Sequence, residues 1–163
     1  MAAHATTDTQ HAHPRNPGVP FDPSWFEELR VNRSATQRRA ATLPARRTVK
    51  KAWQAAWLLK AITLIDLTTL AGDDTAGRVH RLCGKARQPV RRDLLDALGM
   101  HGAPLTTGAV CVYPTMVPHA VDALQGTTIP VASVASGFPA GLMPMTQRLD
   151  EVRWAVDAGA REI

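Results

Sequence analysis

The sequence has only two cysteines, Cys83 and Cys111. Two thiols are too few for a disulfide framework, and neither cysteine stands at a metal-ligand spacing from a histidine. We therefore expect both to be free thiols, and the pattern predicts no metal site.

Long apolar runs are also missing. No stretch of about 18 apolar residues occurs, and the N-terminus has no charged head followed by an apolar segment. The sequence thus predicts neither a membrane span nor a secretory signal, and we expect a soluble, cytoplasmic protein without a membrane partner.

Acidic residues are absent from one stretch, Arg30 to Lys51, which carries eight basic residues. This stretch is the source of the net charge of +5, because the rest of the chain is more acidic than basic. It contains neither interleaved aromatic side chains nor a known nucleic-acid-reading motif. We interpret it as a solvated helical segment and expect no nucleic-acid partner.

Composition changes along the chain suggest three parts. Residues 1–20 have no apolar periodicity, so they cannot bury enough surface to offset the entropy of ordering and are expected to be a disordered tail. Residues 21–47 are expected to form a basic helical extension. Residues 48–163, with the clearest apolar patterns, are expected to form the main domain.

The main domain opens with a predicted helix over residues 48–61. Its apolar stripe of Val49, Trp53, Ala56 and Trp57 is typical of a helix face that packs on a core. Residues 62–70 are mostly β-branched or apolar, which favours a buried strand. Asp66 interrupts this strand, and a carboxylate there is costly unless it is paired or near the strand's open end, so it is a candidate functional residue.

The same pattern then repeats. Further buried strands are predicted at residues 108–114 and 130–136, and residues 161–163 open a fourth. Asp73 and Asp74 are expected to cap the first of the following helices. The predicted core-facing positions of the three helices are Val79, Leu82, Cys83 and Ala86, then Val117, Ala120, Val121 and Leu124, then Leu149, Val152 and Val156.

Repeated strand-helix units with non-alternating apolar strands predict an α/β fold with a parallel sheet and helices outside it. The pattern allows either a doubly wound open sheet or part of a (β/α)8 barrel, and both place function at the carboxyl ends of the strands. No phosphate-binding loop and no G-x-G-x-x-G follows the first strand, which argues against an independent nucleotide-binding module.

Four stretches at the ends of the predicted strands carry a more specific signal. They are IDLTTL at 65–70 with DDT at 73–75, AVCVYP at 109–114, VASVA at 131–135 with FPAG at 138–141, and GAREI at 159–163. In this order and spacing, from about residue 50 to its end, the chain resembles the deoxyribose-phosphate aldolase family, which has the (β/α)8 TIM-barrel fold.

The resemblance implies an aldehyde-lyase of deoxyribonucleotide catabolism. Such enzymes cleave the sugar phosphate 2-deoxy-D-ribose 5-phosphate reversibly into D-glyceraldehyde 3-phosphate and acetaldehyde. They use a lysine Schiff base and no metal or organic cofactor. By position, Asp66 corresponds to an aspartate in the charged network around the catalytic lysines, and Cys111 and Thr68 correspond to substrate-binding positions. Homodimers are common in the family.

The same resemblance places the catalytic lysines on later strands, and a proton-relay aspartate directly after Ile163. Lys60, before the first strand, and Lys85, on an outer helix, are no substitutes. We therefore expect the first three strand-helix units of the barrel and the start of its fourth strand, inactive alone. The alternative is a non-catalytic α/β fragment that acts through association with a partner chain.

Overall fold

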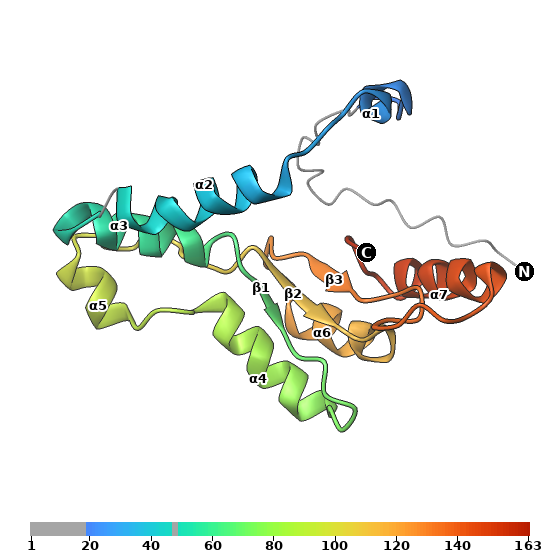
Figure 1. Cartoon of the computed structure of the whole chain (residues 1–163). Helices are drawn as coiled ribbons and strands as arrows, with labels where there is room; N and C mark the ends of the chain where they lie inside the picture. Colours follow the sequence, from blue (N-terminus) through green and yellow to red (C-terminus); the bar gives the residue numbers. More distant parts are fainter. Residues whose placement is uncertain (1–18, 47–48) are drawn as a thin grey trace, which may run out of the picture. The chain divides into compact units, whose positions relative to one another are not determined.

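The structure is a computed structural model that describes residues 19–46 and 49–163. The chain divides into two compact units, residues 1–48 and 49–163, and Figure 1 draws the elements of both. The predicted tail at residues 1–20 lies outside the described residues except for Val19 and Pro20, which are exposed and have no regular structure.

Residues 19–46 of the first unit contain two helices, α1 (Ser24–Glu27) and α2 (Arg33–Arg46). The side chain of Asn32 caps α2, because its Oδ1 accepts a hydrogen bond from the backbone N–H of Ala35 at 3.0 Å. All described residues of this unit are exposed. Its aromatic rings contact one another, with centroids 5.9 to 6.5 Å apart, at Phe21, Trp25 and Phe26.

The second unit opens with α3 (Lys51–Ile62), which is followed by β1 (Asp66–Thr68). The predicted strand at residues 62–70 is therefore too long at both ends. Its first residues continue the helix in a tight turn, since the N–H groups of Leu64 and Ile65 donate to the carbonyl oxygens of Ala61 and Ile62. β-branched residues favoured a strand, but the preceding helix sets the local structure here.

The remaining elements alternate as predicted. They are α4 (Ala76–Arg87), α5 (Arg92–Ala97), β2 (Ala109–Val112), the 3₁₀ turn η1 (Pro114–Met116), α6 (Val117–Ala123), β3 (Val131–Ser133) and α7 (Met145–Asp157). The three strands form one parallel sheet in the order β1-β2-β3. A further parallel bridge joins Ala132 to Glu162 beyond α7. The predicted α/β class with a parallel sheet is confirmed.

The core lies between one face of the sheet and helices α4 and α6 (Figure 1). Val110 and Val112 of β2 and Val131 of β3 are buried there. The helices contribute the predicted positions Val79, Cys83 and Ala86 from α4, and Val117, Ala120 and Leu124 from the segment of α6. Leu82 and Val121 pack at the edge of this core.

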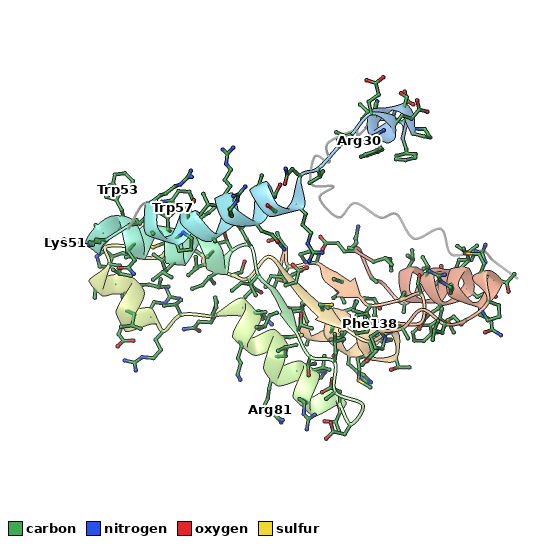
Figure 2. All side chains as sticks on the ribbon, in the orientation of Figure 1. Arg30, Lys51, Trp53, Trp57, Arg81 and Phe138 are labelled. Carbon is green, nitrogen blue, oxygen red and sulfur yellow. The ribbon has the colours of Figure 1, made fainter. Side chains whose placement is uncertain are left out.

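Two helices do not bury the faces that the sequence predicts. On α3, Trp53 is 74% exposed and Trp57 is 63% exposed, and Figure 2 labels both. This helix is apolar on nearly every side, so its pattern cannot single out one inward face. On α7, Leu149 and Val156 are exposed and Ala155 is fully buried instead. Within residues 19–46 and 49–163, no helix is both long and apolar enough to cross a membrane.

Candidate active site at the open face of the sheet

Three predicted site residues lie on one face of the sheet. Neighbouring residues of parallel strands share a face, and the register pairs Thr68 of β1 with Cys111 of β2. Asp66, two residues before Thr68, lies on the same face. Cys111 in turn pairs with Ala132 of β3, which bridges to Glu162. The opposite face carries the core valines, so this row of residues points away from α4 and α6.

An open cavity of about 320 Å³ lies along this row. Its wall brings together two carboxylates, from Asp66 and Glu162, and the Cys111 thiol. The other lining residues come from β3, from the loop after it and from the final bridge segment: Ala132, Ser133, Val134, Ala135, Phe138 and Ile163. Thr68 is not among them. Its hydroxyl donates a hydrogen bond to the carbonyl oxygen of Asp66 at 2.7 Å.

The environment of Cys111 disfavours the thiolate form of its side chain. Burial is the main cause that raises the pKa of this thiol, and the nearby charges of Asp66 and Glu162 raise it further, whereas a side-chain hydrogen bond with Thr68 acts against this shift. A thiol with a raised pKa is a weak nucleophile near neutral pH. Cys111 is therefore suited to lining the cavity rather than attacking a substrate.

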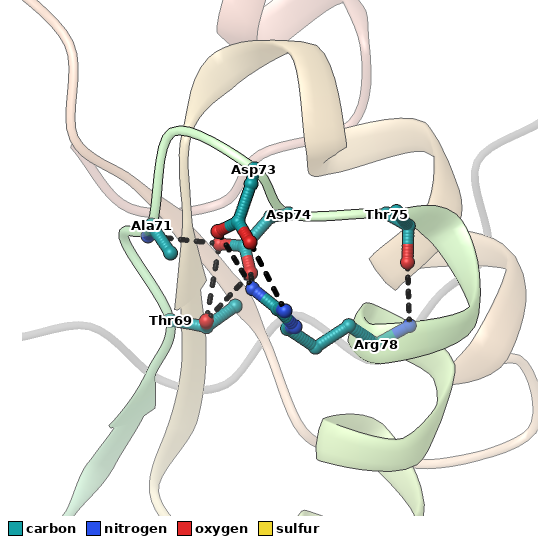
Figure 3. Close-up of polar contacts among 6 residues, drawn as sticks. All are labelled: Thr69, Ala71, Asp73, Asp74, Thr75 and Arg78. Atoms are coloured by element: carbon teal, nitrogen blue, oxygen red, sulfur yellow. Dashed lines mark hydrogen bonds and ion pairs between the residues drawn. The ribbon is translucent and has the colours of Figure 1, made fainter.

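A second polar group fixes the loop that follows β1. The Asp74 carboxylate, 3% exposed, accepts hydrogen bonds from the Thr69 hydroxyl at 2.9 and 3.0 Å and from the Ala71 N–H at 3.1 Å (Figure 3). It also pairs with Arg78 at 3.2 Å. Arg78 binds Asp73 at 2.9 Å, and this contact lowers the pKa of the Asp73 carboxyl.

The helix cap predicted at Asp73 and Asp74 is wrong. Thr75 caps α4, because its Oγ1 accepts a hydrogen bond from the Arg78 N–H at 3.3 Å. Asp74 instead ties the start of this helix to Thr69, the residue that follows β1. The loop is thereby held beside the cavity-lining strands, since the Thr69 N–H donates to the carbonyl oxygen of Cys111 at 3.1 Å.

Known proteins identify the family that the chain resembles. No protein-family model matches it. The deoxyribose-phosphate aldolase of Homo sapiens is 59% identical over 150 residues, which are 91% of this chain and 47% of the relative. That of Bos taurus is 58% identical over 148 residues, covering 90% and 46% of the two chains. The chain thus spans about half the length of these curated relatives.

A solved structure gives the same family name. The crystal structure of a putative deoxyribose-phosphate aldolase from Coccidioides immitis superposes with a TM-score of 0.50 at 25% identity, covering 78% of this chain and 43% of that chain. The predicted resemblance to the deoxyribose-phosphate aldolase family is confirmed.

The positions of the lysines bear on the chemistry that this cavity can support. The four lysines of the sequence are Lys50, Lys51, Lys60 and Lys85. The described cavity wall contains no lysine, arginine or histidine. Lys51 and Lys60 belong to α3 and Lys85 belongs to α4, and none of them lines the cavity. Among the described residues, no group of three or more metal-ligating side chains occurs.

Sequence reasoning singled out Asp66 and Cys111, which both line this cavity, but missed Glu162 and Phe138. Glu162 lies in the first residues of the predicted fourth strand. Pairing of this strand with the third strand could have indicated that Glu162 lies at the cavity. Phe138 lay in a matched loop, FPAG, without any sign of the direction of its ring. Thr68 was predicted to contact substrate, and its site role stays a prediction.

The two cysteines are expected to differ sharply in their rate of alkylation by iodoacetamide. Cys83 is completely buried in the core, whereas Cys111 is part-exposed at the cavity. In the folded protein, Cys111 should be alkylated while Cys83 stays unmodified. Because the Cys111 pKa is raised and the thiolate is the reactive form, the rate should still climb above about pH 8.5, the ordinary thiol value. Peptide mass mapping across a pH series measures this, and a plateau below pH 8 would contradict it.

Proposed function

We propose that this chain is the N-terminal part of a deoxyribose-phosphate aldolase, from the first strand to the start of the fourth. The whole protein would cleave 2-deoxy-D-ribose 5-phosphate reversibly into D-glyceraldehyde 3-phosphate and acetaldehyde through a lysine Schiff base. The observation that carries this proposal is the 59% identity to the human aldolase, which includes the strands that build the cavity. The three parallel strands and the bridge at Glu162 support the first three strand-helix units of a (β/α)8 barrel and the start of a fourth strand.

The charges of the cavity fit such a mechanism. Asp66 and Glu162 supply two carboxylates, and no cationic side chain of the described residues lines the wall with them. Carboxylates favour the charged form of a nearby amine, and they stabilise the cationic iminium that a lysine forms with an aldehyde. We assign Asp66 to the charged network around the reactive lysine. Cys111 is assigned to the substrate wall, and Thr68, its neighbour in the strand register, is assigned to substrate binding beside that wall.

We propose that the reactive lysine lies in the part of the whole protein that corresponds to the half of the relatives not spanned by this chain. Lys60 and Lys85 stand on helices, whereas the cavity row stands on strands. A Schiff base requires the amine within bonding distance of the substrate carbonyl, and neither lysine lines the cavity.

Borohydride trapping tests the proposal. With 2-deoxyribose 5-phosphate, the whole protein should release acetaldehyde and acquire a reduced covalent adduct on a lysine outside residues 1–163. The 163-residue chain alone should give neither product. Omission of the sugar phosphate provides the control, and mass mapping locates the adduct.

Each outcome of the borohydride experiment tests a separate part of the proposal. A trapped adduct on one of the four lysines of this chain would overturn the assignment of the nucleophile. Absence of acetaldehyde release by the whole protein would overturn the proposed activity and favour the alternative, a non-catalytic fragment that acts through a partner chain. The homodimer and the cytoplasmic location stay predictions.

A further inference from the structure

The loop after β3 has a constrained backbone. Ser136 and Gly137 both have positive φ angles, 65° and 74°. The Gly141 N–H donates to the Gly137 carbonyl oxygen at 2.8 Å, which closes the loop on itself. A Cβ at residue 137 would lie 2.7 Å from the sulfur of Met143, so both the φ angle and the close approach favour glycine there.

A carboxylate from another element holds this loop from outside. Glu151, on α7, accepts a hydrogen bond from the Gly137 N–H at 2.6 Å through its Oε2. Hydrogen bonds to an ionised acceptor are about twice as strong as neutral ones. The neighbouring acid on the same helix, Asp150, does something different, because it pairs with Arg153 at the surface at 2.6 Å.

The residue after Gly137 forms part of the cavity wall. Phe138 lines the cavity together with Cys111, and its ring meets that of Tyr113 edge-on with centroids 6.3 Å apart. Figure 2 labels Phe138 beside the strands. Gly137 directly precedes Phe138 in the chain, so the residue that Glu151 binds and the residue that lines the cavity share one peptide bond.

We propose that Glu151 is a positioning residue of the cavity: its hydrogen bond to Gly137 fixes residues 136–141 and keeps Phe138 against the opening beside Cys111. This inference rests on the proposed aldolase function only where it concerns substrate, because the position of the wall is a property of the fold. Glu151 touches no reacting atom in this scheme and acts only through the loop.

The alkylation rate of Cys111 provides a direct test in the whole protein. In Glu151→Ala, Cys111 should react with iodoacetamide about tenfold faster, as expected for loss of a charge-assisted hydrogen bond that keeps the loop closed. Glu151→Gln retains a side-chain oxygen that can accept from Gly137, so its rate should stay within about twofold of the unsubstituted protein. Asp150→Asn is the matched control and should leave the rate unchanged.

Cys83 distinguishes local opening from loss of the fold, because it is completely buried in the core. Faster labelling of Cys111 with Cys83 still protected supports the proposal. An unchanged Cys111 rate in Glu151→Ala overturns it, as does equal acceleration of both cysteines or equal acceleration in Glu151→Gln.

Kinetics with 2-deoxyribose 5-phosphate separate this inference from the proposed function. Glu151→Ala should raise KM more than it lowers kcat, and Glu151→Gln should restore KM. A KM that Glu151→Gln fails to restore overturns the positioning role. If the whole protein does not cleave the sugar phosphate, the proposed function fails, while the labelling result still decides whether Glu151 holds the wall.

Discussion

Replacing Asp74 by alanine is expected to lower the free energy of unfolding by about 3 kcal/mol. The substitution removes a carboxylate that is 3% exposed and leaves the Thr69 hydroxyl and the Ala71 N–H without their acceptor. Part-buried donors without an acceptor cost more than the hydrogen bond alone would suggest. Arg78 keeps its second partner, so the loss stays below that of a fully isolated buried charge.

Asp73→Ala is the matched control, because the two neighbouring aspartates both contact Arg78. The Asp73 side chain is 78% exposed, and its ion pair with Arg78 is at the surface. Exposed pairs are screened by water and salt, so this variant should unfold at nearly the same urea concentration as the unsubstituted protein. Urea unfolding measures the free energy of unfolding of both variants, and the m-value should stay unchanged. Equal destabilisation would show that Asp74 is not the residue that holds the loop.

The Asp74 contacts also illustrate what the sequence could reveal about the loop after β1. Two adjacent acids before a helix predict favourable charge at its N-terminus, and they are found there. The conformation of the loop decides which of the two aspartates contacts Thr69. The local sequence pattern does not determine this conformation. Thr75 took the capping position that the acids were expected to fill.

The sheet could be predicted because apolar strand segments alternate in the sequence with helices that carry an apolar face. Its strand limits could not be predicted, since the same β-branched residues that favour a strand at 62–65 also complete the last turn of α3. Tertiary contacts decide between these two local structures, and the shared apolar character of the segment leaves the pattern ambiguous.

The candidate site was predictable for the residues that resemble a known family and for Asp66, which stands out as a charge in an apolar strand. The grouping of Asp66 with Glu162 depends on strand register across almost the whole second unit. Register follows from how side chains fill the space between sheet and helices, so a period along one strand cannot give it.

Which face of a helix is buried was the property that the sequence predicted least well. A comparison of two valines, one on α4 and one on α7, allows the effect of burial on stability to be measured. Val79 on α4 and Val156 on α7 both belong to the predicted apolar face of their helix, and the sequence predicts both to be in the core. Val79 is completely buried, whereas Val156 is 51% exposed. On α7, fully buried Ala155 takes the inward position instead.

Val79→Ala is therefore expected to lower the free energy of unfolding by about 2 kcal/mol, through lost apolar burial and the cavity left behind. The substitution also improves helix propensity slightly, which offsets part of that loss. Val156→Ala gains the same propensity and leaves no cavity, so its effect should stay within about 0.5 kcal/mol of zero. Because the two variants delete the same atoms from two helices, the difference between them in urea unfolding isolates burial. An equal loss in Val156→Ala would contradict the exposure of this face and would mean that another part of the protein covers α7.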